Sequence, residues 1–147
     1  MKLDIGCGLV GRPDAVKLDL HFWPELTPPD GMMVCANLED PLPFADNTFT
    51  DVRAWDVLEH IHNLFGLMNE LWRVITHDGV LDIVVPRAPH PDAFGDPGHV
   101  RFFTPVTFDY FTPGYGQAFQ VACHKWHITE KRATDNRVFV KMTPAGK

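Results

Sequence analysis

The chain has 147 residues, a length that suits one ordinary domain. Hydrophobic residues make up 45% of it and charged residues 22%, a balance that excludes an intrinsically disordered chain. The formal net charge of −6 argues against duplex nucleic acid or an anionic membrane surface as the main partner.

Two further features bear on where the protein works. No segment approaches the roughly 18 consecutive apolar residues of a transmembrane helix, and the N-terminus has no apolar leader. The three cysteines, Cys7, Cys35 and Cys123, are far apart and form no CxxC motif, which fits a reducing compartment. We therefore expect a single cytoplasmic domain over residues 1–147.

Five short apolar segments bounded by Gly, Pro or Asp predict strands. They are residues 2–5, 15–20, 32–36, 51–55 and 80–85.

A stripe of apolar residues with a period of 3.6 then predicts one amphipathic helix. Its members are Ile61, Leu64, Phe65, Met68, Leu71, Trp72 and Ile75. A shorter helix is expected from Thr104 to about Phe111, because threonine caps helices and Pro105 suits the first helical position.

The C-terminal segment has a different pattern. Residues 119–123 and 137–142 predict two strands, joined through the polar residues 129–136. Strands that alternate with helices and end in an antiparallel pair predict a mainly parallel α/β sheet with an antiparallel edge.

The segment Gly6-Cys7-Gly8-Leu9-Val10-Gly11 matches GxGxxG directly after a predicted strand. It is either a plain glycine-rich turn or a place where the backbone approaches a nucleotide-like ligand. In dinucleotide-binding folds a full helix follows, with an acidic residue about 20 positions on. Here the next strand starts near Ala15 and Asp19 follows soon after, which argues against NAD or FAD. A ligand with adenine and ribose but no phosphate remains compatible.

Five segments in chain order resemble the class I S-adenosylmethionine-dependent methyltransferases. They are Leu3-Asp4-Ile5-Gly6-Cys7-Gly8, Lys17-Leu18-Asp19-Leu20, Leu42-Pro43-Phe44-Ala45-Asp46-Asn47-Thr48-Phe49-Thr50-Asp51-Val52, Val57-Leu58-Glu59-His60-Ile61, and Glu70-Leu71-Trp72-Arg73-Val74-Ile75 with Gly79. Residues 96–105 resemble a small subgroup with a short first crossover. The resemblance implies a Rossmann-like fold with a mainly parallel seven-stranded sheet, an antiparallel C-terminal hairpin, and a shortened or absent first crossover helix.

The resemblance also implies cofactor contacts at the strand ends. The residues concerned are Asp4, Gly6, Cys7, Gly8, Asp19, Leu20, Asn37, Leu38, Trp55 and Asp56. The first four would form the turn around the methionine part, and Asp19 would accept hydrogen bonds from the ribose hydroxyls. Asn37 and Leu38 would lie beside the adenine, and Trp55 and Asp56 beside the reacting methyl group. Carboxylates suit a ligand that carries a sulfonium, an ammonium and a diol.

Three departures from the family pattern stand out. Asn37 replaces the usual acidic residue, and Thr76-His77-Asp78-Gly79 replaces a Lys-Pro-Gly-Gly turn. The short first crossover leaves part of one sheet face without a helix. We expect another copy of the chain, as a homodimer, or the Phe22-Trp23-Pro24 loop to cover it.

Methyl transfer depends mainly on alignment, so a base is needed only where the acceptor loses a proton. His60 is the first candidate, and helix N-terminal chemistry is the simpler explanation for it. His99 and Arg101 lie on a long loop, residues 89–103, which we expect to close over the acceptor. Arg101 would pair with an acidic acceptor or with Asp96.

The eight histidines allow structural, substrate-binding and metal-binding roles, but no spacing matches HExxH, and we expect no metal site. The predicted function is methyl transfer from S-adenosylmethionine, with S-adenosylhomocysteine as product, to a small-molecule acceptor. The alternatives are a non-catalytic module of the same fold, a metal-dependent enzyme built on the histidines, and a nicotinamide oxidoreductase.

Overall fold

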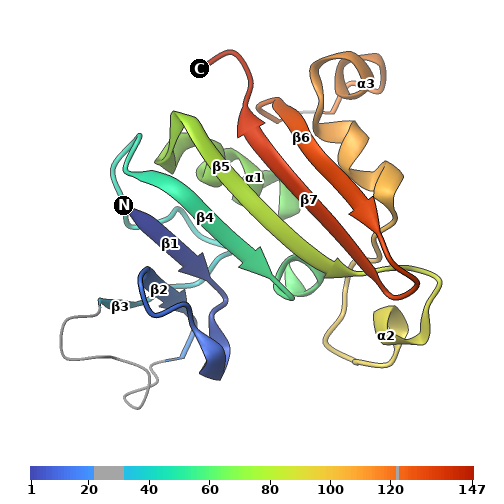
Figure 1. The fold of residues 1–147 in the computed structure, drawn as a ribbon, viewed down its shortest axis with the longest axis horizontal. Helices are drawn as coiled ribbons and strands as arrows, with labels where there is room; N and C mark the ends of the chain where they lie inside the picture. Colours follow the sequence, from blue (N-terminus) through green and yellow to red (C-terminus); the bar gives the residue numbers. More distant parts are fainter. Residues whose placement is uncertain (22–31, 122) are drawn as a thin grey trace.

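A computed structural model describes residues 1–21, 32–121 and 123–147. These residues form a seven-stranded sheet with the order β3-β2-β1-β4-β5-β7-β6 (Figure 1). The first five strands are parallel, whereas β7 is antiparallel to both β5 and β6, as predicted. The strands are β1 (Lys2–Ile5), β2 (Val16–Asp19), β3 (Met33–Cys35), β4 (Phe49–Trp55), β5 (Ile75–Pro86), β6 (Trp126–Ala133) and β7 (Arg137–Pro144).

Short helices connect most of these strands. They are η1 (Gly8–Val10), η3 (Leu58–His60), α1 (Leu64–Val74), α2 (Pro91–Phe94), η4 (Pro105–Phe111) and α3 (Pro113–Ala118). In the described part of the first crossover, a single 3₁₀ turn, η1, stands where a full helix is usual, as the sequence predicts. None of the helices in the described ranges is long and apolar enough to cross a membrane.

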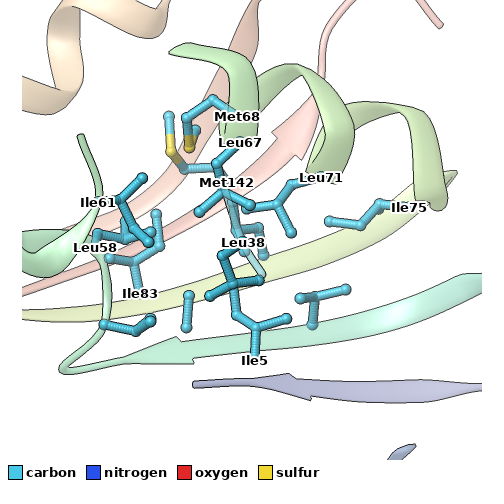
Figure 2. Close-up of a cluster of buried hydrophobic side chains, with 14 of the residues drawn as sticks. Ile5, Leu38, Leu58, Ile61, Leu67, Met68, Leu71, Ile75, Ile83 and Met142 are labelled. Carbon is cyan, nitrogen blue, oxygen red and sulfur yellow. The ribbon is translucent and has the colours of Figure 1, made fainter. Parts of the chain in front are cut away.

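The hydrophobic core lies between α1 and one face of the sheet (Figure 2). The Asn63 side chain caps α1 by accepting a hydrogen bond from the Gly66 amide at 3.0 Å. The helix therefore starts at Leu64, three residues later than its apolar stripe predicts, although Ile61 is still buried. The core includes Leu3, Ile5, Val52, Ala54, Leu67, Met68, Leu71, Leu81, Ile83, Val138, Val140 and Met142.

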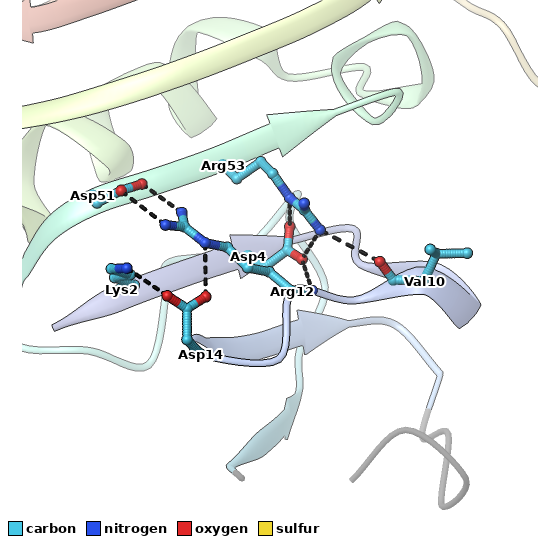
Figure 3. Close-up of polar contacts among 7 residues, drawn as sticks. All are labelled: Lys2, Asp4, Val10, Arg12, Asp14, Asp51 and Arg53. Atoms are coloured by element: carbon cyan, nitrogen blue, oxygen red, sulfur yellow. Dashed lines mark hydrogen bonds and ion pairs between the residues drawn. The ribbon is translucent and has the colours of Figure 1, made fainter. Parts of the chain in front are cut away.

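On the opposite face of the sheet, the described residues place charged side chains and no long helix. Side chains alternate along a strand, so Asp51 and Arg53 point away from the core that holds Val52. Arg12 bridges Asp14 and Asp51, and Arg53 pairs with Asp4 (Figure 3). This network occupies the face that we expected a second copy or the Phe22-Trp23-Pro24 loop to cover. That loop lies outside the described residues.

The prediction for the C-terminal segment is wrong in part. Residues 119–121 and 123 form no strand, and the strand β6 starts only at Trp126. Residues 134–136 therefore join the hairpin, rather than residues 129–136. β6 is a solvent-exposed edge strand in which only Trp126 and Ile128 alternate as apolar residues, and residues 129–132 are all polar, so the apolar pattern is too short to predict the strand. The expected helix after Thr104 is a 3₁₀ helix, and α3 was not predicted.

Candidate functional site

Two adjoining cavities lie at the carboxyl ends of β1, β2, β3 and β4, where open α/β sheets bind ligands. Their volumes are about 400 Å³ and about 210 Å³, and both are lined by Gly6 and Asp56. The larger cavity is also lined by Asp19, Leu20, Ala36, Asn37, Leu38, Glu39, Val57, His60 and Ile61. The smaller cavity is also lined by Asp4, Cys7, Val10, Arg53 and Trp55. All the predicted cofactor-binding residues except Gly8 therefore line one cavity or the other.

The glycine turn requires glycine for two reasons. Gly6 has a φ of +60°, and a Cβ at this position would lie 2.3 Å from Cγ2 of Val57. The Gly6 amide donates to the Leu18 carbonyl at 2.8 Å, which ties the turn to β2. Gly8 has a φ of +50°, and its amide donates to Oδ2 of Asp19 at 2.8 Å. Gly8 thus shapes the site through Asp19 although it does not line a cavity.

Asp19 ends β2 and is held from both sides. Its Oδ2 accepts from the Gly8 amide and its Oδ1 accepts from the His21 amide at 3.1 Å. Each carboxylate oxygen can accept two hydrogen bonds, so each can still accept one from a ligand. A fixed carboxylate at the cavity wall is suited to the two hydroxyls of a ribose.

Asp4 is almost entirely buried, with 2% of its surface exposed. Its Oδ1 accepts from Arg53 Nε at 2.9 Å, and its Oδ2 accepts from the Arg12 amide at 2.7 Å. The Asp4 carboxylate therefore accepts its hydrogen bonds from the protein and ties the segment after the glycine turn to β1 and β4. Burial, together with the charges of Asp19 and Asp4, raises the pKa of the neighbouring Cys7 thiol to about 11.

The third strand end supplies an apolar wall. Leu38 is buried, while the Asn37 side chain accepts from the Glu39 amide at 3.0 Å in a local turn. The Glu39 carboxylate accepts from the amides of His62 and Asn63 at 2.7 and 2.8 Å. These contacts join the loop after β3 to the segment before α1 and close one side of the larger cavity.

The fourth strand ends in a strained residue. Asp56 has a φ of +51°, its amide donates to the Val84 carbonyl at 2.8 Å, and its carboxylate pairs with Arg137. Trp55 is 44% exposed and lies under the guanidinium of Arg53, 4.7 Å from the ring centre. The backbone at Asp56 thus turns the chain toward the place where both cavities meet.

The three predicted catalytic residues do not converge on one cavity. His60 lines the larger cavity, with Nδ1 donating to the Gly98 carbonyl at 3.0 Å. His99 lines neither cavity among the described residues, and its side chain is 7% exposed beside Glu59. Arg101 donates to the carbonyls of Ile61 and His62, and no ion pair with Asp96 is present in the described structure.

The loop expected to act as a lid is fixed to the segment after β4. The amides of Val100 and Arg101 both donate to the Glu59 carbonyl, at 2.8 and 3.2 Å. Burial raises the pKa of the Glu59 carboxyl, which is 2% exposed. The loop is therefore held against the segment after β4, and none of its residues, all of them described, lines either cavity.

Four residues of the larger cavity had no predicted role in binding or catalysis. Val57 and Ile61 belong to a segment quoted for the family resemblance, and their buried apolar character next to β4 was the available signal. Ala36 and Glu39 flank the predicted Asn37 and Leu38, so the strand end itself pointed to them.

The residues present fit an adenosyl amino acid. A turn whose φ and packing require glycine brings backbone to the cavity, and Leu38 and Ile61 offer an apolar wall. Asp19 and Asp56 add carboxylates at the rim, which suit a diol and a cationic sulfonium. The crossover after the turn offers only the 3₁₀ turn η1, so no long helix presents its N-terminus to a pyrophosphate.

This fold and strand-end site define a protein of the methyltransferase type. The family model described as Methyltransferase domain matches residues 3–83, more than half of the chain, and the chain belongs to this family. Membership confirms the predicted class and, with it, S-adenosylmethionine as the cofactor. No curated protein matches the chain.

Solved structures agree on the fold. A SAM-dependent methyltransferase from Archaeoglobus fulgidus is 13% identical, with a TM-score of 0.67 over 97% of this chain and 85% of that one. The 1,6-didemethyltoxoflavin-N1-methyltransferase of Burkholderia thailandensis, solved with its substrate and S-adenosylhomocysteine, is 14% identical, with a TM-score of 0.71 over 98% and 70%. A chain in a Haloferax volcanii complex of a methyltransferase with its activator Trm112 is 14% identical, with a TM-score of 0.69 over 97% and 81%. At these identities the likeness concerns the fold alone.

Proposed function

We propose that residues 1–147 act as one methyltransferase domain that transfers the methyl group of S-adenosylmethionine to a small molecule. The observation that carries this proposal is the Asp19 carboxylate, held by the Gly8 amide at 2.8 Å at the wall of the larger cavity. The Burkholderia neighbour, whose name gives it a small-molecule substrate, supports the choice of acceptor class. The non-catalytic alternative is not favoured, because family and site agree.

The two cavities suggest how the cofactor is divided between them. In the larger one, Asp19 would accept the ribose hydroxyls, while Leu20 and Leu38 would pack against the adenine near Asn37. In the smaller one, the backbone of Gly6 and Cys7 would lie along the methionine part. The cofactor supplies an activated methyl group when bound.

The side chains that line the smaller cavity near Asp56 would bind the charged groups of the cofactor. Arg53 lines the smaller cavity and would attract the carboxylate of the methionine part. Asp56 and Trp55 stand at the end of β4, where a carboxylate and an aromatic ring both favour a sulfonium cation. These residues hold the cofactor in line with an acceptor, and such alignment accounts for most of the catalysis that methyl transfer needs.

His60 is the group that we propose to face the acceptor. It lines the larger cavity together with Asp56, beside which the sulfonium and its methyl group would lie, and the hydrogen bond from its Nδ1 to the Gly98 carbonyl fixes the ring. His99 and Arg101 act as positioning residues in this proposal: Arg101 donates from the loop to the Ile61 carbonyl, and the His99 ring lies edge-on to the His60 ring, with 4.8 Å between ring centres.

A thermal melt tests the cofactor assignment. S-adenosylhomocysteine at 100 times its dissociation constant stabilises a protein by about 2.7 kcal/mol, or roughly 5–10 °C for a domain of this size. NADH serves as the negative control. The Asp19→Asn variant should lose most of the shift, since a hydrogen bond to a charged group contributes about 1.5–3 kcal/mol.

The matched control is Asp135→Asn, because the Asp135 carboxylate is 98% exposed and lies outside both cavities. It should keep the full shift. Absence of a melting-temperature shift with S-adenosylhomocysteine, or an equal shift with NADH, would count against the proposal.

A further inference from the structure

Three potential metal ligands meet beside the larger cavity. Glu59, His60 and His99 each offer one ligand atom, and these three atoms lie within 4.8 Å of one another. Two imidazoles and one carboxylate are a donor set that zinc and other divalent transition metals prefer. The sequence did not group these residues, because Glu59 and His60 follow β4 whereas His99 lies on the loop after β5.

Both imidazole rings are fixed in the way that metal-binding histidines usually are. Nδ1 of His60 lies 3.0 Å from the Gly98 carbonyl, and Nδ1 of His99 lies 2.9 Å from the Ala93 carbonyl. A carbonyl only accepts, so each Nδ1 must donate its proton. In the neutral ring the other nitrogen, Nε2, then carries the lone pair that can bind a metal. Such backbone partners orient metal-ligating histidines.

The Glu59 carboxylate is buried, and one of its oxygens has no hydrogen-bond partner among the described residues. Glu59 is 2% exposed, and its Oε2 has no hydrogen-bond partner within the described structure. Its Oε1 lies 3.9 Å from His99 Nε2, and Asp96 Oδ2 lies 3.6 Å from the same nitrogen. Both distances exceed a hydrogen bond. A buried carboxylate oxygen without a partner is costly, and a cation at this point would satisfy it.

We propose that Glu59, His60 and His99 bind one divalent transition-metal ion, with Zn²⁺ as its representative, at the edge of the larger cavity. Ligand atoms around a tetrahedral zinc with bonds of about 2.1 Å lie about 3.4 Å apart. The three ligand atoms, which lie within 4.8 Å of one another, must therefore approach by up to about 1.4 Å when the ion binds. Three protein ligands leave one position open, as in catalytic zinc sites.

The coordination position that the protein leaves open could be taken by the acceptor. If the proposed function holds, an ion held by His60 would face the acceptor, because His60 lines the larger cavity together with Asp56, beside which the reacting methyl group would lie. A bound ion lowers the pKa of a coordinated hydroxyl or water, so His60 would act on the acceptor through the ion rather than as a free base. The site therefore selects an acceptor that offers an oxygen ligand. Metal binding itself is independent of methyl transfer.

Isothermal titration of EDTA-treated protein with Zn²⁺ tests the proposal. We expect one ion per chain, and a loss of affinity in Glu59→Gln and in His60→Gln above the roughly 10–100-fold that is typical when only a partner of a metal ligand is removed. Both variants preserve most of the side-chain volume. Circular dichroism establishes that each variant is folded before it is titrated. Co²⁺ gives a second readout, because a site with nitrogen ligands produces visible absorption bands that should change in Glu59→Gln.

The matched control is His77→Ala, since the His77 side chain is 77% exposed on β5 and outside the cluster. It should bind Zn²⁺ as the unchanged protein does. Absence of 1:1 binding, or an equal loss of affinity in His77→Ala, would overturn the proposal. The melt with S-adenosylhomocysteine is run without metal, so a failure of the zinc site is distinguishable from a failure of the cofactor assignment.

Discussion

At the scale of single residues, Cys7 reports on the electrostatics of the glycine turn. Its thiol is buried, and burial with the charges of Asp19 and Asp4 raises its pKa to about 11. Only the thiolate reacts with iodoacetamide, and at pH 8 a group with this pKa is about 0.1% thiolate. We expect Cys7 to be alkylated about 100-fold more slowly than the exposed Cys35, as followed by mass spectrometry of digested protein.

The pH dependence gives this prediction its control. The Cys7 rate should rise about tenfold per pH unit until pH 11, because the thiolate fraction rises in that proportion. Asp19→Asn removes one of the negative charges that raise the pKa, so it should speed the reaction at pH 8. Equal rates for Cys7 and Cys35 would contradict the burial of the thiol.

At the scale of elements, the turn after β1 depends on Gly6 more than on Gly8. Both residues have positive φ, but only at Gly6 would a Cβ collide with Val57. Gly6→Ala should lower the free energy of unfolding by about 3 kcal/mol, the sum of backbone strain and overpacking. Gly8→Ala should cost about 1 kcal/mol, because its Cβ would meet open space. Urea denaturation measures both, and equal losses would show that the Val57 contact is unimportant.

Elements with an apolar run or stripe were predictable, whereas the mainly polar strand β6 was not. The strands β1, β2 and β4 and the helix α1 were found from apolar runs and a 3.6-residue stripe, because their side chains fill the core. β6 lies at the edge of the sheet and carries mainly polar residues, so the apolar pattern of the sequence did not predict its pairing with β7. Residues 119–121, which were predicted as part of a strand, follow α3, and Phe119 contacts Tyr110 and Tyr115.

At the scale of the whole molecule, the cofactor side of the site was more predictable than the acceptor side. Asp19, Asn37 and Asp56 each sit at the end of a strand, and parallel strands end at one edge of the sheet. The cluster of Glu59, His60 and His99 depends instead on a loop that folds back over 38 residues of sequence. The contact between residues this far apart depends on tertiary packing, which the periodicity of a short sequence segment does not predict.

At the same scale, charged side chains cover the sheet face on which the described residues place no long helix, and Arg53 pairs with the buried Asp4 of this face. Arg53→Met leaves the buried Asp4 without its cationic partner, and should cost about 3 kcal/mol in urea denaturation. Arg12→Met is the matched control, because the carboxylates of Asp14 and Asp51 are 52% and 36% exposed; its cost should be below about 1 kcal/mol. Added salt should shrink the small effect and leave the large one, since burial protects the Asp4 pair from screening. Similar, salt-sensitive losses in both variants would mean that the face is stabilised by surface charge alone.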